Sequence, residues 1–128
     1  MILPGSLQRG DGPAVEGIAQ GDDDGPSLWL LLVDEVQTGV GRTGTMFAYQ
    51  QFDIQPDVLT FAKGIAGGLP FGGFMTNEKC REVLRAGDHG STFGGNPVSA
   101  AAANVVMDTL TPEFLAQVAE KGQYLRDG

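Results

Sequence analysis

The stretch Ser27-Leu28-Trp29-Leu30-Leu31-Leu32-Val33-Asp34-Glu35 decides the fold class of this chain. Its apolar residues follow one another without polar alternation, which is typical of a strand buried on both faces of a parallel sheet. The run ends abruptly at Asp34 and Glu35, and ligands gather at the carboxyl ends of the strands in α/β sheets. We therefore predict an α/β fold with a candidate site where this strand ends.

The elements expected further along the chain fit this fold class. They are, in chain order, a short helix over 46–52, strands over 57–61 and 71–76, and a helix over 77–85 with Thr76 or Asn77 as its cap. Two later helices are expected to begin at Asn96-Pro97 and Thr111-Pro112, because each pair places a capping residue before a proline at the first helical position.

Lys63 follows the strand expected over 57–61 and lies between two small residues, Ala62 and Gly64. Most lysines are solvated surface charges, but we expect this one to be partly desolvated, which would make its amine a usable nucleophile. A basic amine, an acid at a strand end and an anion-binding loop are what a pyridoxal phosphate (PLP) site needs. The amine forms a Schiff base, the acid keeps the pyridine nitrogen protonated, and the loop meets the phosphate.

Asp34 and Gln37 are the candidate partners of the pyridine ring. A carboxylate after a long apolar run is costly unless it is paired, and a protonated pyridine nitrogen would be a suitable partner for Asp34. Gln37 can hydrogen-bond the phenolic oxygen of the cofactor. The alternatives are that Asp34 only bonds a loop amide and that Gln37 is an ordinary polar loop residue.

A turn at Gly90-Ser91-Thr92 is the candidate phosphate cradle. It offers backbone N–H groups and the hydroxyls of Ser91 and Thr92 without bulk, and the helix expected after Asn96 adds a favourable field for an anion. Many ordinary turns have this composition, so the turn indicates a phosphate site only in combination with Lys63 and Asp34.

The composition narrows the classes of function. The formal net charge of −8 argues against nucleic acid and anionic membranes as partners. Cys80 is the only cysteine, so an internal disulfide is impossible, and this fits a reducing, cytoplasmic setting. No apolar run reaches membrane-spanning length. We expect no metal site, and the Gly-x-x-x-x-Gly-Lys-Ser/Thr loop of a nucleotide-binding protein is absent from the sequence.

Residues 1–27 differ from the rest of the chain. They are rich in Gly, Pro and Asp, carry most of their charge as acid, and show no helical or strand period. We expect an atypical leader there that is loop-like or disordered, followed by one domain over 28–128.

The stretch Leu32-Val33-Asp34-Glu35-Val36-Gln37-Thr38-Gly39-Val40-Gly41-Arg42-Thr43-Gly44 resembles the signature of the class III PLP-dependent aminotransferases. Ala62-Lys63-Gly64 and Gly90–Pro97 follow in the order and at the spacing of that family. The resemblance covers roughly residues 28–128. The stretches Gly67–Gly73 and Gly87–Pro97 are most similar to the acetylornithine-type subgroup.

The resemblance implies a fold, a reaction and a set of roles. The chain would be a fragment of the large PLP-binding domain of a fold-type I aminotransferase. Lys63 would carry the internal aldimine and move the proton between the substrate α-carbon and C4′ of the cofactor. Asp34 would pair with the pyridine nitrogen and Gln37 would touch O3′. Thr92 would bind the phosphate of the neighbouring subunit, which implies a homodimer.

The implied reaction moves an amino group from N2-acetylornithine to 2-oxoglutarate in arginine biosynthesis. The small-molecule partners would be this amino donor and the 2-oxo acid acceptor. Ornithine, succinylornithine, 4-aminobutyrate and diaminobutyrate stay open as donors, because the segments that grip the substrate carboxylate have no match in this sequence. A non-catalytic remnant is the alternative from a different class of protein.

Other parts of the family pattern also have no match. These are an upstream phosphate loop, an aromatic that stacks on the pyridine ring, and the small C-terminal domain. We therefore expect little or no activity from the isolated 128-residue chain, since an incompletely built site loses its orienting power steeply. Residues 1–27 do not resemble the family, and a reading-frame shift upstream of codon 28 is a hypothesis that would explain them.

Overall fold

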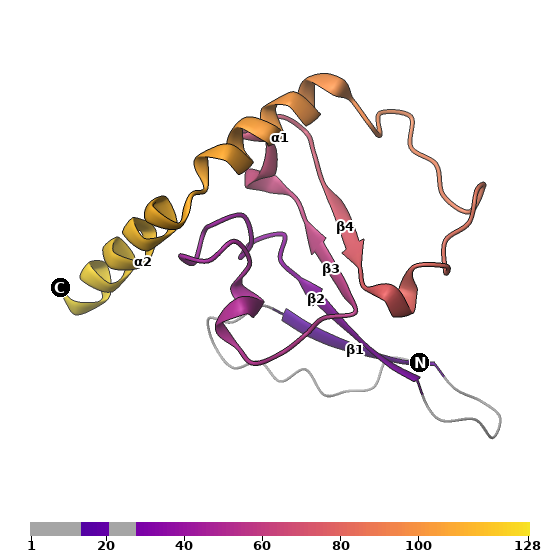
Figure 1. The fold of residues 1–128 in the computed structure, drawn as a ribbon, viewed down its shortest axis with the longest axis horizontal. Coiled ribbons are helices and arrows are strands. Elements are labelled where there is room, and N and C mark those ends of the chain that lie inside the picture. The colour runs from indigo at the N-terminus through magenta and orange to yellow at the C-terminus, as the bar shows by residue number, and fades with distance from the viewer. Residues whose placement is uncertain (1–13, 21–27) are drawn as a thin grey trace.

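A computed structural model describes residues 14–20 and 28–128 of the chain (Figure 1). The strands are β1 (Ala14–Gln20), β2 (Leu28–Asp34), β3 (Val58–Phe61) and β4 (Gly73–Thr76), and the helices are α1 (Pro97–Thr109) and α2 (Pro112–Asp127). Three short 3-10 helices are η1 (Ala48–Gln51), η2 (Lys63–Ala66) and η3 (Glu78–Cys80). None of the helices in these ranges is long and apolar enough to cross a membrane.

The strands form one mixed sheet in the order β1-β2-β3-β4. Only the central pair, β2 and β3, is parallel, and both outer pairings are antiparallel. The α/β class is confirmed, while the sheet is less uniformly parallel than the apolar run at 28–33 indicated. β1 and β4 each occupy an edge, where antiparallel partners are readily accepted.

The parallel register between β2 and β3 sets the geometry of the site. Val33 pairs with Leu59, and Asp34 pairs with Thr60. Since side chains alternate between the two faces of a strand, each pair shares one face. Val33 and Leu59 are buried at 0% and 5% exposure, so the next pair, Asp34 and Thr60, lies together on the opposite face at the strands' carboxyl ends.

Asp57 ties the start of β3 to both of its neighbours. Its carboxylate accepts hydrogen bonds from the backbone N–H of Leu31 (2.8 Å) and the side-chain amide of Asn77 (2.6 Å), and Lys79 lies 2.8 Å away. These interactions lower the pKa of Asp57 to about 2, with the hydrogen bond from Lys79 as the largest cause, followed by the Leu31 N–H. The Asp57 carboxylate therefore links the start of β3 to β2 and to the end of β4, and helps to fix how these strands align.

The apolar core lies between η2 and α1. Ile65, Ala66 and Ala103 are buried against one another, and Val40 and Phe61 pack around them. The small Ala103 lets α1 approach the short helix that begins at Lys63 (Figure 1). The core thus supports the segment that carries the lysine.

Both predicted proline-led helices are confirmed, together with their caps. The side chain of Asn96 accepts hydrogen bonds from the N–H groups of Val98 (2.9 Å) and Ser99 (3.3 Å), and the Thr111 hydroxyl accepts one from Phe114 N–H (3.3 Å). These bonds satisfy amide groups that have no partner inside the helix.

Two of the expected segments differ from the structure. The helix expected over 77–85 is only the 3-10 turn Glu78–Cys80, although Asn77 caps it as predicted. Residues 81–85 are exposed, and Val83 and Leu84 are themselves 65% and 52% exposed, so burial of an apolar face does not stabilise a longer helix here. Strand β1 lies within the segment expected to be loop-like or disordered, because pairing along the β2 edge can impose a strand on residues with no strand period. The rest of that segment, 1–13 and 21–27, lies outside the described residues.

Candidate active site

Asp34 ends β2 with its carboxylate held from two sides. Its Oδ1 accepts a hydrogen bond from the backbone N–H of Val36 (2.9 Å), which closes a tight turn, and another from the hydroxyl of Thr60 on β3 (3.0 Å). Among the hydrogen bonds and ion pairs of residues 14–20 and 28–128, none reaches Oδ2. Asp34 therefore presents a fixed, exposed acceptor at the carboxyl edge of the sheet.

Lys63 and Gln37 meet at the same edge. The Lys63 amine donates a hydrogen bond to Oε1 of Gln37, in the turn that follows Asp34. Lys63 has a positive φ of 51°, a left-handed conformation that is uncommon outside glycine and that costs backbone energy. This conformation begins η2 directly after β3 and turns the chain where the amine meets Gln37.

The expected desolvation of Lys63 is wrong for this structure, since its side chain is exposed. The flanking Ala62 and Gly64 offer too little side chain to cover it. What the structure provides instead is a polar partner, the Gln37 amide, that holds the amine in place.

Glu35 fixes the loop that carries Gln37. Its side chain is fully buried, and its carboxylate accepts hydrogen bonds from the Thr38 hydroxyl (2.5 Å) and the backbone N–H of Tyr49 (2.7 Å). A Cβ at Gly39 would lie 2.7 Å from the Glu35 carbonyl oxygen, so this position tolerates only glycine. The acid next to Asp34 is thus a structural group within the loop.

Ser91 and Thr92 lie apart from the other predicted site residues. They belong to a segment, residues 81–98, in which every residue is exposed, and Figure 1 shows it running outward between η3 and α1. Ser91 lines a shallow pocket of about 250 Å³ with Pro70, Phe71 and Gly72, and Thr92 is outside its lining. No hydrogen bond among the described residues joins either hydroxyl to Lys63, Asp34 or Gln37.

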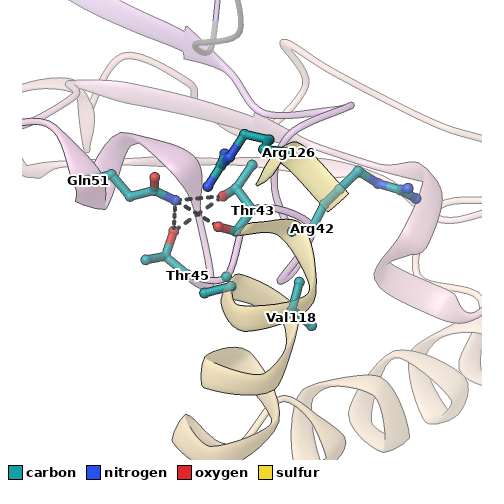
Figure 2. Close-up of a pocket in the computed structure, with 9 residues that line it drawn as sticks. Arg42, Thr43, Thr45, Gln51, Val118 and Arg126 are labelled. Carbon is teal, nitrogen blue, oxygen red and sulfur yellow. Dashed lines mark hydrogen bonds between the residues drawn. The ribbon is translucent and has the colours of Figure 1, made fainter. Parts of the chain in front are cut away.

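A second cleft, of about 420 Å³, lies between the 42–45 loop and the last turns of α2 (Figure 2). Its polar groups are already paired with one another, since the Gln51 amide donates to the Thr43 carbonyl (3.1 Å) and hydroxyl (2.9 Å) and to the Thr45 hydroxyl (3.0 Å). In the view of Figure 2, the Arg42 side chain points away from that of Arg126. The cleft shares no residue with the Asp34–Lys63 edge, and we assign it a packing role.

The fold and the Asp34–Gln37–Lys63 cluster define a class of protein. The family model of class-III aminotransferases matches residues 27–128, and the chain belongs to this family. Class-III aminotransferases are PLP-dependent transaminases.

Three relatives show how close the similarity is. The acetylornithine aminotransferase of Haemophilus ducreyi is 58% identical over 121 residues, which cover 94% of this chain and 30% of that protein. The succinylornithine transaminase of Photorhabdus laumondii is 46% identical over 99 residues, or 77% of this chain and 25% of that protein. The solved ornithine aminotransferase of Toxoplasma gondii superposes with a TM-score of 0.71 at 38% identity, covering 77% of this chain and 24% of that one.

The chain thus spans about 24–30% of the length of these relatives. The match to the Haemophilus ducreyi protein spans 121 residues, more than the 101 residues from 28 to 128. It therefore extends into the segment before residue 28, and at least part of the predicted leader aligns with that relative.

The residues at the carboxyl edge fit the family's cofactor chemically. Lys63 offers an amine for the PLP aldehyde, Oδ2 of Asp34 is an acceptor for a protonated ring nitrogen, and Gln37 keeps its amide N–H donors for a phenolic oxygen because it meets Lys63 through Oε1. The sequence pointed to these three groups. It missed Thr60, Glu35 and Asp57, because their roles depend on strand register and loop closure.

Proposed function

We propose that this chain forms the lysine-bearing part of the PLP site of an aminotransferase that moves an amino group from N2-acetylornithine to 2-oxoglutarate. The observation that carries the proposal is the meeting of Lys63 and Gln37 beside Asp34, at the carboxyl edge of the β2–β3 pair. The similarity to an acetylornithine aminotransferase supports this donor. In this proposal, residues 28–128 are part of the large cofactor-binding domain.

Each residue of the edge has a defined task. Bound PLP withdraws electrons from the carbon that carries the amino group, and this makes a C–H proton there removable. The Lys63 amine would be the base that takes that proton from the substrate α-carbon and gives it to C4′ of the cofactor, and the Gln37 side chain would hold this amine in place through Oε1. The Asp34 carboxylate keeps the ring nitrogen protonated. The Gln37 N–H groups hold the phenolic oxygen.

A homodimer is part of the proposal. The segment with Ser91 and Thr92 is exposed along its whole length and forms no hydrogen bond to the lysine edge of its own chain within the described residues. This supports a role for Thr92, with Ser91 beside it, at the phosphate of a neighbouring subunit. A cytoplasmic setting is proposed on the single cysteine and the biosynthetic reaction.

The lysine assignment is tested by trapping. Purified chain is incubated with PLP, reduced with borohydride, digested and mapped by mass spectrometry. We expect the added mass on Lys63 and its absence in Lys63→Arg, while Lys79 and Lys121 serve as internal controls on exposed helical positions. Equal labelling of all three lysines would show that Lys63 has no special reactivity and would contradict the proposal.

The donor is tested with the same protein. Glutamate formed from 2-oxoglutarate is measured with N2-acetylornithine, succinylornithine and ornithine as donors. We expect little or no turnover, since the chain covers a minor part of the length of its relatives, and we expect any turnover to be fastest with acetylornithine. A faster reaction with succinylornithine or ornithine would reassign the donor, and both names occur among the relatives.

A further inference from the structure

We propose that Thr60 is a positioning residue of the site: its hydroxyl fixes the Asp34 carboxylate so that Oδ2 faces the cationic ring nitrogen of the cofactor. The inference rests on the proposed function for the identity of the cation. The hydrogen bond itself, 3.0 Å from Thr60 Oγ1 to Asp34 Oδ1, is a feature of the chain alone.

The strand register explains why Thr60 can do this. Asp34 and Thr60 are direct partners in the parallel β2–β3 ladder, and their side chains share one face of the sheet. A threonine is stiff at χ1 because it branches at Cβ, so a hydroxyl on a paired strand is well placed to hold a neighbouring carboxylate. The backbone N–H of Glu35 also donates to the Thr60 carbonyl (3.0 Å), which binds the two strand ends together at this level.

The two donors to Asp34 act on the same oxygen. The Val36 N–H, at 2.9 Å, and the Thr60 hydroxyl both reach Oδ1, and they come from different elements, the turn after β2 and strand β3. A carboxylate gripped at one oxygen from two directions has its side-chain rotation fixed, and its second oxygen is left to a ligand. Without the Thr60 hydroxyl, only the hydrogen bond from the Val36 N–H remains. Val36 lies two residues after Asp34 in the same turn, so this bond does not tie the carboxylate to a second element.

The consequence is specific to a cation opposite Oδ2. Loss of the hydroxyl should weaken binding of PLP by about tenfold, or about 1.4 kcal/mol, which is the lower end of what a hydrogen bond to a charged group contributes. It should leave unchanged the binding of a PLP analogue whose ring nitrogen is replaced by carbon, because that ring offers Asp34 no charge.

The variants are Thr60→Val, which keeps the shape, and Thr60→Ser, which keeps the hydroxyl. Valine has a high propensity for strands, so Thr60→Val is expected to fold. Thr60→Ala is the second variant without the hydroxyl. PLP and the carbon analogue are titrated into each protein and followed by absorbance, alone and in an Asp34→Ala background.

We expect Thr60→Val and Thr60→Ala to lose about tenfold in PLP affinity and Thr60→Ser to stay near the parent. The loss should vanish with the carbon analogue and in the Asp34→Ala background. An equal loss for both ligands, or an undiminished loss without Asp34, would show that Thr60 only supports the strand and would overturn the inference.

A second measurement keeps this test separate from the proposed function. If the parent chain does not bind PLP, the proposed function fails for this chain, and the Asp34 side chain is then examined in the free protein by NMR three-bond couplings. We expect one χ1 rotamer in the parent and in Thr60→Ser, and rotamer averaging in Thr60→Val. A single rotamer in Thr60→Val would overturn the inference without reference to any ligand.

Discussion

Replacing Asp57 by asparagine should destabilise the chain and remove part of its response to acid. The Asp57 side chain is 5% exposed, and its carboxylate accepts from the Leu31 N–H on one oxygen and from Asn77 and Lys79 on the other. Asparagine has the same shape but a single acceptor oxygen, so one set of donors loses its partner and faces another N–H group instead.

The magnitude follows from the pKa of Asp57. It is lowered from 3.8 to about 2 by the Lys79, Leu31 and Asn77 hydrogen bonds. At about 1.4 kcal/mol per pKa unit, this difference corresponds to about 2 kcal/mol of stability at neutral pH. Because the folded pKa lies below the unfolded one, this stability is fully present above pH 3.8 and is lost as the pH falls toward 2.

The assay is urea unfolding followed by circular dichroism at several pH values, with amide hydrogen exchange at Leu31 as a local readout. We expect Asp57→Asn to lose about 2 kcal/mol at pH 7 and to show a smaller further loss between pH 4 and pH 2 than the parent. The control is Asp53→Asn, an exposed acid on the preceding loop. Parent-like stability at pH 7, or unchanged exchange at Leu31, would refute the reasoning.

Three further changes test the packing that supports the site. Gly44→Ala should lower the free energy of unfolding in urea by about 1–3 kcal/mol, because the new Cβ would lie 2.7 Å from the Cβ of Ala119 and the backbone φ is +91°. The control is Gly122→Ala in α2, where the new Cβ would meet open space, and it should be neutral or stabilising. Asn96→Ala removes the cap of α1 and should lower the unfolding free energy by about 1 kcal/mol; an unchanged value would show that the cap is redundant. Glu35→Ala should lower the melting temperature and reduce the free energy of unfolding by about 1–3 kcal/mol, because the Thr38 hydroxyl and the Tyr49 N–H lose their acceptor. The control is the exposed Glu78→Ala, whose free energy of unfolding should stay within about 0.5 kcal/mol of the parent.

Site residues could be predicted from the sequence where the argument depends on their neighbours in the chain. Asp34 is predicted because an acid ends an apolar strand, and Lys63 because an amine follows the next strand. The caps of the last two helices were predicted for the same reason, since Asn96 and Thr111 bond amides two or three residues further on. The roles of Ser91 and Thr92 stay predictions, because no hydrogen bond among the described residues joins their hydroxyls to Asp34, Gln37 or Lys63.

The sequence by itself determined the α/β class, the family and the start of each long helix, and it predicted Asp34, Gln37 and Lys63 as site residues. These properties follow from short-range patterns: apolar runs, capping pairs and a characteristic order of motifs. Only the tertiary structure decided that β2 is parallel to β3 but antiparallel to β1, and that Thr60 meets Asp34 across the ladder. Strand register and loop closure join residues about 26 positions apart, through hydrogen bonds whose partners no local pattern specifies.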